Sequence, residues 1–338
     1  MTPDRSADTK AFLAEAGWGH ADRALLAGDA SPRRYDRLSR GAERAVLMDA
    51  PPDTSEDVRP FVAVTEWLQA NGLSAPALLA SDPDRGFLLI EDLGDALFAR
   101  HVVNQPTEED TLYAAAVDLL GTLARQRPPD WLAPYDAAAL LREARLLTEW
   151  YLPTAKPDPS SDRNRTYDAL ITDACAEVAT VATTVVLRDY HTENLIWLPR
   201  RSGHARVGLL DYQDALAGHP AYDLASLLGD ARRDTSPELR AAMMSRYLDG
   251  WPAAEADAFR TAYATLGAQR NLKIVGIFAR LALRDGKPGY LDLIPRVWSH
   301  LMRDLSAPHL GPLARWVHAH VPAPDPAILE RFRTGAAR

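Results

Sequence analysis

The sequence predicts an α+β chain in two lobes, a small lobe with an antiparallel sheet followed by a large, mostly helical lobe. The 338 residues are too many for one small core. Up to residue 93, short apolar runs alternate with turn signals, whereas helical patterns dominate afterwards. We therefore expect residues 1–93 to form the first lobe and residues 94–338 the second, and a cleft between two such lobes is a natural ligand site.

The first lobe is expected to hold two hairpins and two helices. Strands are predicted at 33–39, 44–49, 77–81 and 87–91, and helices at 9–16 and 56–70. Gly41 marks the turn of the first hairpin, and the two prolines after its second strand end it because proline cannot donate to a ladder. In the second helix, Phe61, Val64 and Leu68 share one face, which predicts a helix packed on a sheet.

The second lobe is expected to be a series of helices with one short hairpin among them. Helical patterns cover 107–126, 136–152, 164–181, 220–232, 236–249, 253–283 and 323–334. Leu195–Leu198 and Arg206–Leu210 are short and mostly apolar, and the turn signal RRSG lies between them with Gly203 at its tip.

Composition narrows the class of protein. Apolar residues make up 47% of the chain, which is typical of a globular protein, and the net charge of −8 makes general nucleic-acid binding a poor expectation. The single cysteine, Cys175, permits no intrachain disulfide and fits a reducing compartment, so a cytoplasmic location is expected. The start of the chain lacks a secretory pattern and no apolar run is long enough to span a membrane, so neither a signal nor a membrane partner is predicted.

Three polar residues around the predicted hairpin indicate phosphoryl transfer. Asp189 is followed five residues later by Asn194, and Asp211 closes an apolar run 17 residues beyond that. In a hairpin centred on Ser202–Gly203, Asn194 lies opposite Asp211, and directly opposed Cα atoms are roughly 4.5–5.5 Å apart. Their oxygens would then share one cation, with Asp189 beside it to face an acceptor hydroxyl. Either aspartate alone is most simply the polar end of a hairpin, but the spaced set of three favours the site.

These features resemble the aminoglycoside phosphotransferase branch of the protein-kinase-like fold. The strings GDASPRRYDRL, AVLMDAPP, RDYHTENLIWLP, LLDYQDALAGHPAYDLASLL and LGAQRNLKIVGIFARL are similar to the anomeric N-acetylmuramate/N-acetylglucosamine kinases of bacterial cell-wall sugar recycling. The resemblance covers most of the chain. It implies a bilobal kinase-like fold and the transfer of a phosphoryl group from ATP, with Mg²⁺, to the anomeric (C1) hydroxyl of one or both sugars.

The resemblance also implies roles for individual residues. Asp189 would orient the sugar hydroxyl and accept its proton, while Asn194 and Asp211 would hold magnesium on the ATP phosphates. Glu91 and Leu93, between the lobes, would offer backbone groups to adenine.

The chain departs from the usual kinase pattern around the phosphates. The turn that ends in Ser31 would cover them, but it has no repeated glycine motif. Met48 stands where kinases place a lysine for the α- and β-phosphates, so another cation must meet them. Arg33 and Arg34 are the nearest candidates, because arginine can hold a phosphate bidentately, although both could be ordinary solvated strand positions.

The acceptor side is less sharply indicated. Arg270 and Lys273 lie one turn apart on a predicted helix and could meet the carboxylate of a muramic acid, or simply form a basic solvated stripe. Asp214 could hydrogen-bond a sugar hydroxyl or be a turn aspartate. Asp223 is predicted to be structural, bonding backbone N–H groups of the Asp189 segment or of its own helix.

Two alternatives stay open. One is a small-molecule kinase for another acceptor, of the aminoglycoside, choline or homoserine type, although an Arg270/Lys273 face would suit a polycation poorly. The other is a non-catalytic nucleotide-binding pseudokinase, which Met48 and Leu187 favour, the latter because a histidine often stands there. The complete set of Asp189, Asn194 and Asp211 argues against it. Oligomeric state is not indicated by the sequence.

Overall fold

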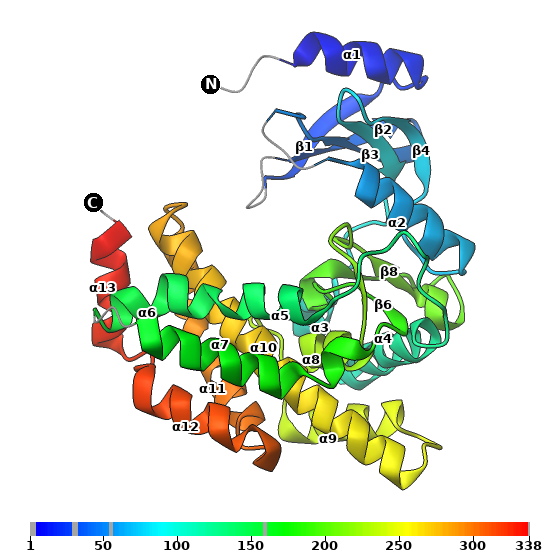
Figure 1. Cartoon of the computed structure of the whole chain (residues 1–338). Coiled ribbons are helices and arrows are strands. Elements are labelled where there is room, and N and C mark those ends of the chain that lie inside the picture. Colours follow the sequence, from blue (N-terminus) through cyan, green and yellow to red (C-terminus); the bar gives the residue numbers. More distant parts are fainter. Residues whose placement is uncertain (1–4, 29–32, 54–56, 158–160, 337–338) are drawn as a thin grey trace. The chain divides into compact units, whose positions relative to one another are not determined.

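The structure, a computed structural model, describes residues 5–28, 33–53, 57–157 and 161–336 (Figure 1). Its contacts divide the chain into two compact units. The first unit comprises Met1–Ala115 and Glu193–Ala215, and the second comprises Ala116–Thr192 and Leu216–Arg338. The contacts therefore group residues 94–115 and the 193–215 segment with the N-terminal part, which differs from a simple division after residue 93. That boundary between a nucleotide lobe and a substrate lobe stays a prediction.

The first unit is built on a five-stranded antiparallel sheet with the order β1-β2-β3-β5-β4. The strands are β1 (Asp22–Gly28), β2 (Arg34–Arg40), β3 (Glu43–Asp49), β4 (Leu78–Asp82) and β5 (Phe87–Glu91). Four of them confirm the predicted hairpins, and Gly41 does sit in the β2–β3 turn with φ of 61°. β1 was not predicted, and it pairs with β2 from Asp22–Ser39 to Gly28–Arg34.

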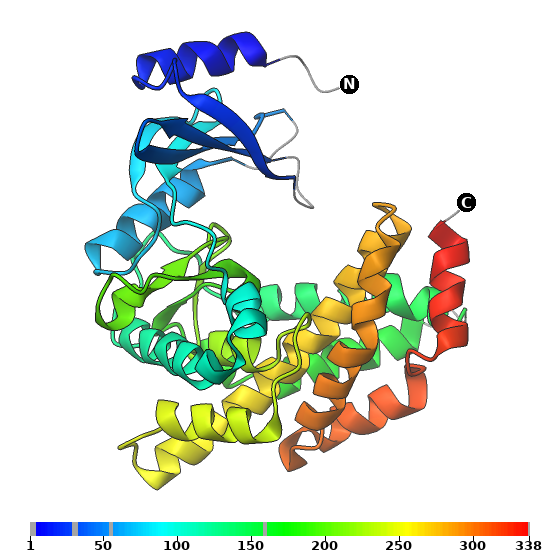
Figure 2. The ribbon, with the colours of Figure 1, turned by 180° about the vertical axis from the view of Figure 1, so that it is seen from behind.

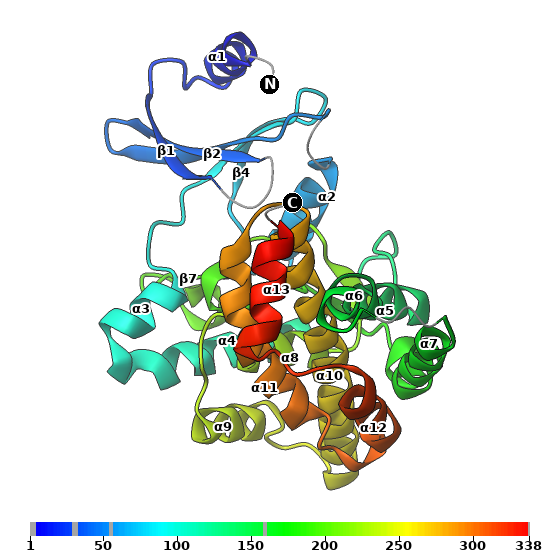
Figure 3. The ribbon, with the colours of Figure 1, turned by 90° about the vertical axis from the view of Figure 1, so that its left-hand side faces the viewer.

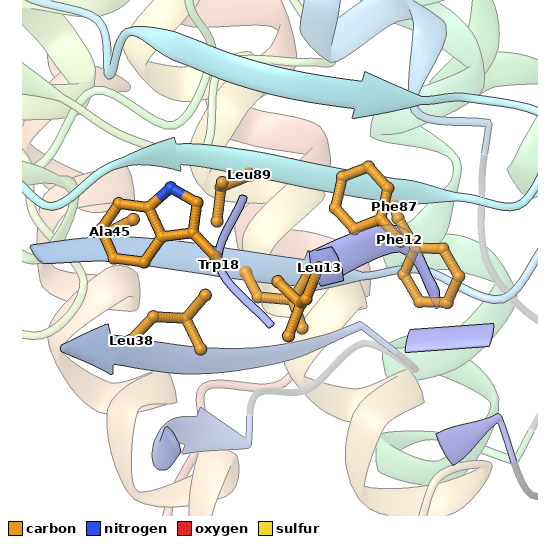
Figure 4. Packing of buried hydrophobic residues seen from close by; sticks show 8 residues of the cluster. Phe12, Leu13, Trp18, Leu38, Ala45, Phe87 and Leu89 are labelled. Atoms are coloured by element: carbon orange, nitrogen blue, oxygen red, sulfur yellow. The ribbon is translucent and has the colours of Figure 1, made fainter. Parts of the chain in front are cut away.

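Helix α1 (Ser6–Glu15) covers one face of this sheet (Figure 1, Figure 2). Phe12 and Leu13 of α1 pack with Trp18 against the alternate inward residues of the strands (Figure 4). Phe12 stacks on Phe87 with ring centroids 5.4 Å apart. Because side chains alternate along a strand, Ala45 and Leu47 of β3 face this cluster, whereas Met48, also buried, faces the other side of the sheet.

The rest of the first unit consists of short helices and the predicted hairpin. Helix α2 (Arg59–Ala70) confirms the predicted helix and buries Phe61, Val64 and Leu68. Helix α3 (Phe98–Asn104) was not predicted, and α4 (Glu109–Leu123) begins in this unit. The hairpin consists of β7 (Leu195–Trp197) and β8 (Val207–Leu209), with a 3₁₀ turn at Gly203–Arg206 between them.

The register of the hairpin corrects one detail of the prediction. Leu195 pairs with Leu209, and this register places Leu210 opposite Asn194. The Leu210 N–H donates to the Asn194 carbonyl at 3.0 Å. Asn194 is therefore not directly opposite Asp211. The 3₁₀ turn moves the centre of the hairpin by half a residue from Ser202–Gly203, and a one-residue slip alters which residues face one another.

The second unit is mostly helical. Its helices are α5 (Ala137–Ala144), α6 (Leu152–Ala155), α7 (Ser161–Cys175), α8 (Ala221–Leu228), α9 (Pro237–Tyr247), α10 (Ala253–Leu283), α11 (Ile294–Asp304), α12 (Gly311–His320) and α13 (Pro326–Ala336). Two short strands, β6 (Thr184–Val186) and β9 (Leu216–Gly218), pair with each other. The predicted 253–283 helix matches α10, whereas α11 and α12 were not predicted.

Helix α10 organises this unit, and α8, α11 and α13 pack along it (Figure 3). At Gly276, α10 packs against the backbone of Leu146, which lies just before a π-helical turn at Leu147–Tyr151. A Cβ at Gly276 would lie 2.2 Å from the carbonyl carbon of Leu146, so only glycine lets the two backbones approach this closely. The predicted 136–152 helix is consequently divided, with α5 ending at Ala144 and the π-helical turn following. Across the described ranges, no helix is both long and apolar enough to cross a bilayer.

A matched pair of glycine substitutions would test the turns of the first sheet. Gly41 and Gly86 both have positive φ, of 61° and 73°. A Cβ at Gly41 meets nothing within 4 Å, whereas one at Gly86 would lie 2.0 Å from the Ala50 carbonyl oxygen. We expect Gly41→Ala to cost about 1–2 kcal/mol for left-handed backbone and Gly86→Ala about 1–3 kcal/mol more for the clash. Urea unfolding measures both, and equal costs would contradict the close approach at Gly86.

Candidate functional site

The segment 187–192, here called the Asp189 loop, leaves β6 in the second unit. Its backbone is tightly wound, because the Asp189 N–H donates to the Leu187 carbonyl at 2.9 Å and the His191 N–H to the Asp189 carbonyl at 3.1 Å. Arg188 has φ of 70°, a left-handed conformation that is uncommon for a residue with a side chain. Such a backbone persists only where neighbouring contacts hold it.

Asp223, on the first turn of α8, makes the contacts that hold this backbone in place. Its two carboxylate oxygens accept the Leu187 N–H at 2.7 Å and the Arg188 N–H at 2.9 Å. This confirms the prediction of a structural aspartate bonded to the segment that carries Asp189. Burial raises the pKa of Asp223 to about 7, against the opposing pull of the two N–H groups and of Arg270. The loop is thus fixed by a carboxylate that is itself almost fully enclosed.

The side chain of Arg188 is held by a second buried acid, Glu143 of α5. One oxygen of Glu143 accepts from Arg188, and the other accepts from the Tyr135 hydroxyl and pairs with Lys273 Nζ at 3.0 Å. Burial opposes ionisation of Glu143, but Lys273 and then Arg188 hold its pKa below the ordinary value. The pKa of Arg188 is raised despite burial, chiefly by Glu143. Two cations on one carboxylate leave the network with a net positive charge beside Asp189.

The C-terminal half of the Asp189 loop is fixed separately. Thr192 donates its hydroxyl to Asp230 at 2.7 Å, and the Tyr190 hydroxyl donates to the Ala116 carbonyl at 2.8 Å. His191 is buried, which lowers its pKa to about 4 and keeps the ring neutral near pH 7. Its N–H is bonded to the Asp189 carbonyl, so His191 makes a contact within the loop. Asp189 is half-buried within this frame.

Asn194 and Asp211 come together in the first unit. Asn194 Nδ2 lies 3.4 Å from Asp211 Oδ2, and Gln213 Nε2 donates to the other carboxylate oxygen at 2.9 Å. Asp211 is exposed and has φ of 57°, so its backbone is also left-handed. The prediction that these two side chains meet is therefore confirmed, by a route other than direct cross-strand opposition.

The donor chemistry of this pair fits magnesium better than a softer ion. A carboxylate and an amide oxygen are hard ligands, and Mg²⁺ commonly takes one or two carboxylates and fills its other positions with water and phosphate oxygens. Within the described ranges, no group of three or more His, Cys, Asp or Glu side chains is placed to hold a metal ion.

The predicted adenine contacts lie at the end of β5. The Glu91 N–H already donates to the Ala77 carbonyl at 2.8 Å, so the group it has to offer a nucleotide is its carbonyl. Its side chain is also engaged, with Arg201 Nη2 at 2.6 Å. The Leu93 side chain lies against Gly208 of β8, where a Cβ would come within 3.0 Å of Leu93 Cδ1. The hairpin backbone therefore packs directly under this segment.

An ion-pair cluster that sequence reasoning missed fixes the same segment. Arg37 of β2 binds Asp92 and Asp95, which flank Leu93, with its nearest nitrogens at 2.8 Å from each carboxylate. Asp92 also accepts the Gly94 N–H at 2.9 Å. The string EDLGD, residues 91–95, is thus held to β2 by ion pairs. The only cue to this in the sequence was the presence of two aspartates in the string and of an arginine in a predicted strand.

The predicted phosphate contacts are placed unevenly. Ser31 lies outside the described residues. Arg33 is buried, whereas Arg34 is exposed and reaches Asp36 at 3.2 Å. Met48 lies within the sheet and is almost fully buried, so that strand position offers no charge.

The predicted acceptor contacts belong to two different units. Asp214 is exposed near Asp211 in the first unit. Arg270 and Lys273 are buried in the second unit, where Arg270 Nη1 donates to the Gly229 carbonyl at 3.3 Å and Lys273 is paired with Glu143. They are not a solvated stripe, as one reading of the sequence had it. A contact with a substrate carboxylate stays a prediction.

Comparison with known proteins places the chain in a family. The model of the phosphotransferase enzyme family matches residues 22–256. The chain belongs to this family.

Its more specific likeness is to a group of bacterial kinases. An N-acetylmuramate/N-acetylglucosamine kinase of Caulobacter vibrioides is 41% identical over 95% of this chain and 98% of its own length. A protein of the same name from Pseudomonas aeruginosa is 37% identical over 86% of each chain.

Solved structures confirm the kinase-like fold. An ethanolamine kinase from Plasmodium vivax aligns with a TM-score of 0.62 and 10% identity, covering 90% of this chain and 89% of that one. An aminoglycoside-3'-phosphotransferase of type VIII aligns with a TM-score of 0.51 and 18% identity, covering 77% and 98%. The predicted α+β architecture of a small antiparallel sheet and a large helical part is thereby confirmed.

Replacing Asp223 would test the hold on the Asp189 loop. In Asp223→Asn, one N–H keeps an acceptor while the other faces an amide NH₂, so the loop loses one of its two anchors. We expect kcat to fall at least about tenfold, the equivalent of one net hydrogen bond to a charged group. Asp136→Asn is the control, because Asp136 caps α5 through a single N–H and asparagine caps equally well.

The same variant would alter the pH dependence of stability. Since burial raises the pKa of Asp223 to about 7, the folded protein binds this proton more tightly than the unfolded chain between about pH 4 and pH 7. Wild-type stability should therefore fall as pH rises through this window, and the variant should lack that contribution. Urea unfolding at several pH values measures the difference, and a constant gap between the two proteins would contradict it.

Proposed function

We propose that this protein transfers the γ-phosphoryl group of ATP to the anomeric (C1) hydroxyl of N-acetylmuramate, N-acetylglucosamine or both. It would act as a sugar 1-kinase in peptidoglycan recycling in the cytoplasm. The observation that carries the choice of sugar is the 41% identity to a kinase of that name over nearly the full length of both chains. Family membership supports phosphoryl transfer, and the three site residues that such chemistry needs are all present.

Asp189 is the proposed catalytic residue. Its carboxylate would accept a hydrogen bond from the sugar hydroxyl and take the proton as the oxygen attacks phosphorus. The loop around it is fixed by Asp223 and Arg188, which favours a defined position for the carboxylate and so reduces the entropy lost on reaching the transition state.

The remaining roles concern the nucleotide and the acceptor. Asn194 and Asp211 would hold Mg²⁺, which when bound neutralises charge on the phosphates. The Glu91 carbonyl and the Leu93 N–H would meet adenine. The larger set of proposed polar contacts is Ser31, Arg33 and Arg34 with the phosphates, and Asp214, Arg270 and Lys273 with the sugar.

A kinase for a different acceptor is the first alternative. Solved structures of ethanolamine, choline and aminoglycoside kinases share the fold, but at identities of 10–18% they support the fold alone. The relatives at 34–41% identity carry the sugar-kinase name. A non-catalytic protein is the second alternative, which the uncharged Met48 favours.

A substrate panel would separate these functions. We expect turnover of ATP with N-acetylmuramate or N-acetylglucosamine, and none with kanamycin, choline or homoserine. Turnover should disappear when the anomeric hydroxyl is blocked as the methyl glycoside, because the proposed nucleophile is then absent. ADP release measures all cases. Turnover of the methyl glycoside would exclude C1 as the site, and silence across the panel would favour the non-catalytic alternative.

Removing the proposed base should spare the fold and lose the chemistry. We expect Asp189→Ala to lower kcat by about 10²–10⁴, the usual contribution of a general base. Asp257→Ala is a control, because that aspartate is exposed on α10 and pairs only with nearby Arg260 among the contacts seen. Circular dichroism should match wild type for both. Turnover of Asp189→Ala within a few-fold of wild type would show that Asp189 is not the base.

Lys273 offers a test of how the sugar is recognised. If Lys273 serves mainly as the counter-ion of Glu143, Lys273→Met should lower activity with both sugars by a similar factor. It should also destabilise the fold by about 3–5 kcal/mol, the usual cost of breaking a buried pair. We expect this result. A rise in KM for N-acetylmuramate alone, with normal stability, would instead show that Lys273 contacts the substrate carboxylate. Lys10→Met, at an exposed position of α1, controls for loss of charge.

A further inference from the structure

Tyr212, the residue after Asp211, makes a pair of contacts with α2 that the chemistry above does not use. Its ring is completely buried and stacks on Phe61 with centroids 5.0 Å apart and planes 19° from parallel. Its hydroxyl lies 2.7 Å from Thr65 Oγ1. All four residues belong to the first unit.

The direction of this hydrogen bond follows from the proton count. Thr65 has one hydroxyl proton and donates it to the Phe61 carbonyl at 2.7 Å. The proton between the two hydroxyls must then come from Tyr212, and Thr65 Oγ1 accepts it. Burial raises the pKa of Tyr212, so the phenol keeps its proton at any physiological pH. Phe61, Thr65 and Tyr212 thus form one chain of donors and acceptors anchored in the α2 backbone.

Asp211, the residue next to Tyr212, has a left-handed backbone conformation. Asp211 and Arg188 are the two non-glycine residues with positive φ in the part of the chain that the structure describes. A left-handed conformation is uncommon outside glycine, although aspartate adopts it more readily than most residues, and contacts on both sides of Asp211 help to hold it. On one side, the Leu210 N–H is bonded to the Asn194 carbonyl at 3.0 Å. On the other side, Tyr212 is the fixed point.

Other kinases connect a strand lysine to a glutamate on this helix, but the chain has no such pair. Met48 is uncharged, and Glu66 of α2 is exposed. A buried polar contact of α2, from Thr65, goes instead to the residue adjoining Asp211. The helix therefore contacts the metal-binding segment directly, through two neutral hydroxyl groups.

We propose that Tyr212 is a positioning residue, which with Thr65 and Phe61 of α2 holds the Asp211 carboxylate in the geometry that binds Mg²⁺. The inference rests on the proposed function, because it takes Asp211 as a magnesium ligand. It adds a residue whose action is exerted through Asp211 and that touches neither substrate nor metal.

Metal binding in the absence of sugar is the direct test. Mn²⁺ would be titrated into ATP-saturated protein and followed by electron paramagnetic resonance, so that no turnover is needed. We expect Tyr212→Phe and Thr65→Val each to weaken Mn²⁺ binding by about 5-fold, the equivalent of one net hydrogen bond. Thr65→Ser should stay near wild type, because serine keeps the acceptor. The double variant should be no worse than either single variant, since both remove the same bond.

Steady-state kinetics give a second readout. The Mg²⁺ concentration for half-maximal rate should rise in Tyr212→Phe, while the KM for the sugar stays the same. Tyr167→Phe is the matched control, because the Tyr167 hydroxyl is also buried and donates to a backbone carbonyl, at 2.9 Å, in the second unit. That variant should lose stability without any change in metal binding. An equal loss of metal affinity in Tyr167→Phe would show that the effect in Tyr212→Phe is general destabilisation and would overturn the proposal.

Asp211→Asn distinguishes a failure of the proposed function from a failure of the positioning role of Tyr212. If that variant binds Mn²⁺ as wild type does, Asp211 is not a ligand and the proposed function fails at this residue, along with the positioning role. If Asp211→Asn loses metal while Tyr212→Phe and Thr65→Val bind it normally, the positioning role alone is wrong. Should Thr65→Val fail to fold, Tyr212→Phe still decides the outcome.

Discussion

The bonds from the two backbone N–H groups of Leu187 and Arg188 to the buried carboxylate of Asp223 are the constraint on which the proposed chemistry depends. They permit a left-handed residue immediately before Asp189, and they do so from a helix that is itself enclosed. Glu143 then binds the Arg188 side chain and forms an ion pair with Lys273. The proposed base is thus positioned through the contacts that Asp223 and Glu143 make with the residues just before it, in keeping with catalysis that relies on placement more than on covalent participation.

Much of the fold could be predicted because local patterns agree with the final structure. The β2–β3 and β4–β5 hairpins have clear turns, and α10 has a long helical pattern. Strand β1 was missed because Leu25 and Leu26 are both exposed, so the strand shows no alternation of buried and exposed residues. Helices α11 and α12 follow proline- and glycine-containing segments that read as loops. The π-helical turn depends on the close approach to Gly276, a contact between segments far apart in sequence.

The candidate site was predictable where residue type alone sets the chemistry, and not where burial does. Asp189, Asn194 and Asp211 were found from their spacing, and Asp223 from its place at a helix start. Glu143 and Tyr212 carry no motif, and their roles arise mainly from partners more than 40 positions away. Lys273 could be read either as a substrate contact or as a solvent-facing cation, because a sequence does not show that an acid from another helix pairs with it.

The first unit is made of two segments that lie far apart in the sequence, and this affects when it can finish folding during synthesis. Its sheet and α2 are made early, but Leu209 donates to Ser74, Trp197 donates to Ala96, and Tyr212 packs on Phe61. Until residue 215 has left the ribosome, these partners are missing and an apolar part of α2 has nothing to cover it. By then the whole intervening 116–192 segment of the second unit has also emerged. The unfinished first unit must therefore avoid aggregation until the hairpin, which lies nearly 80 residues further along the chain, has been synthesised.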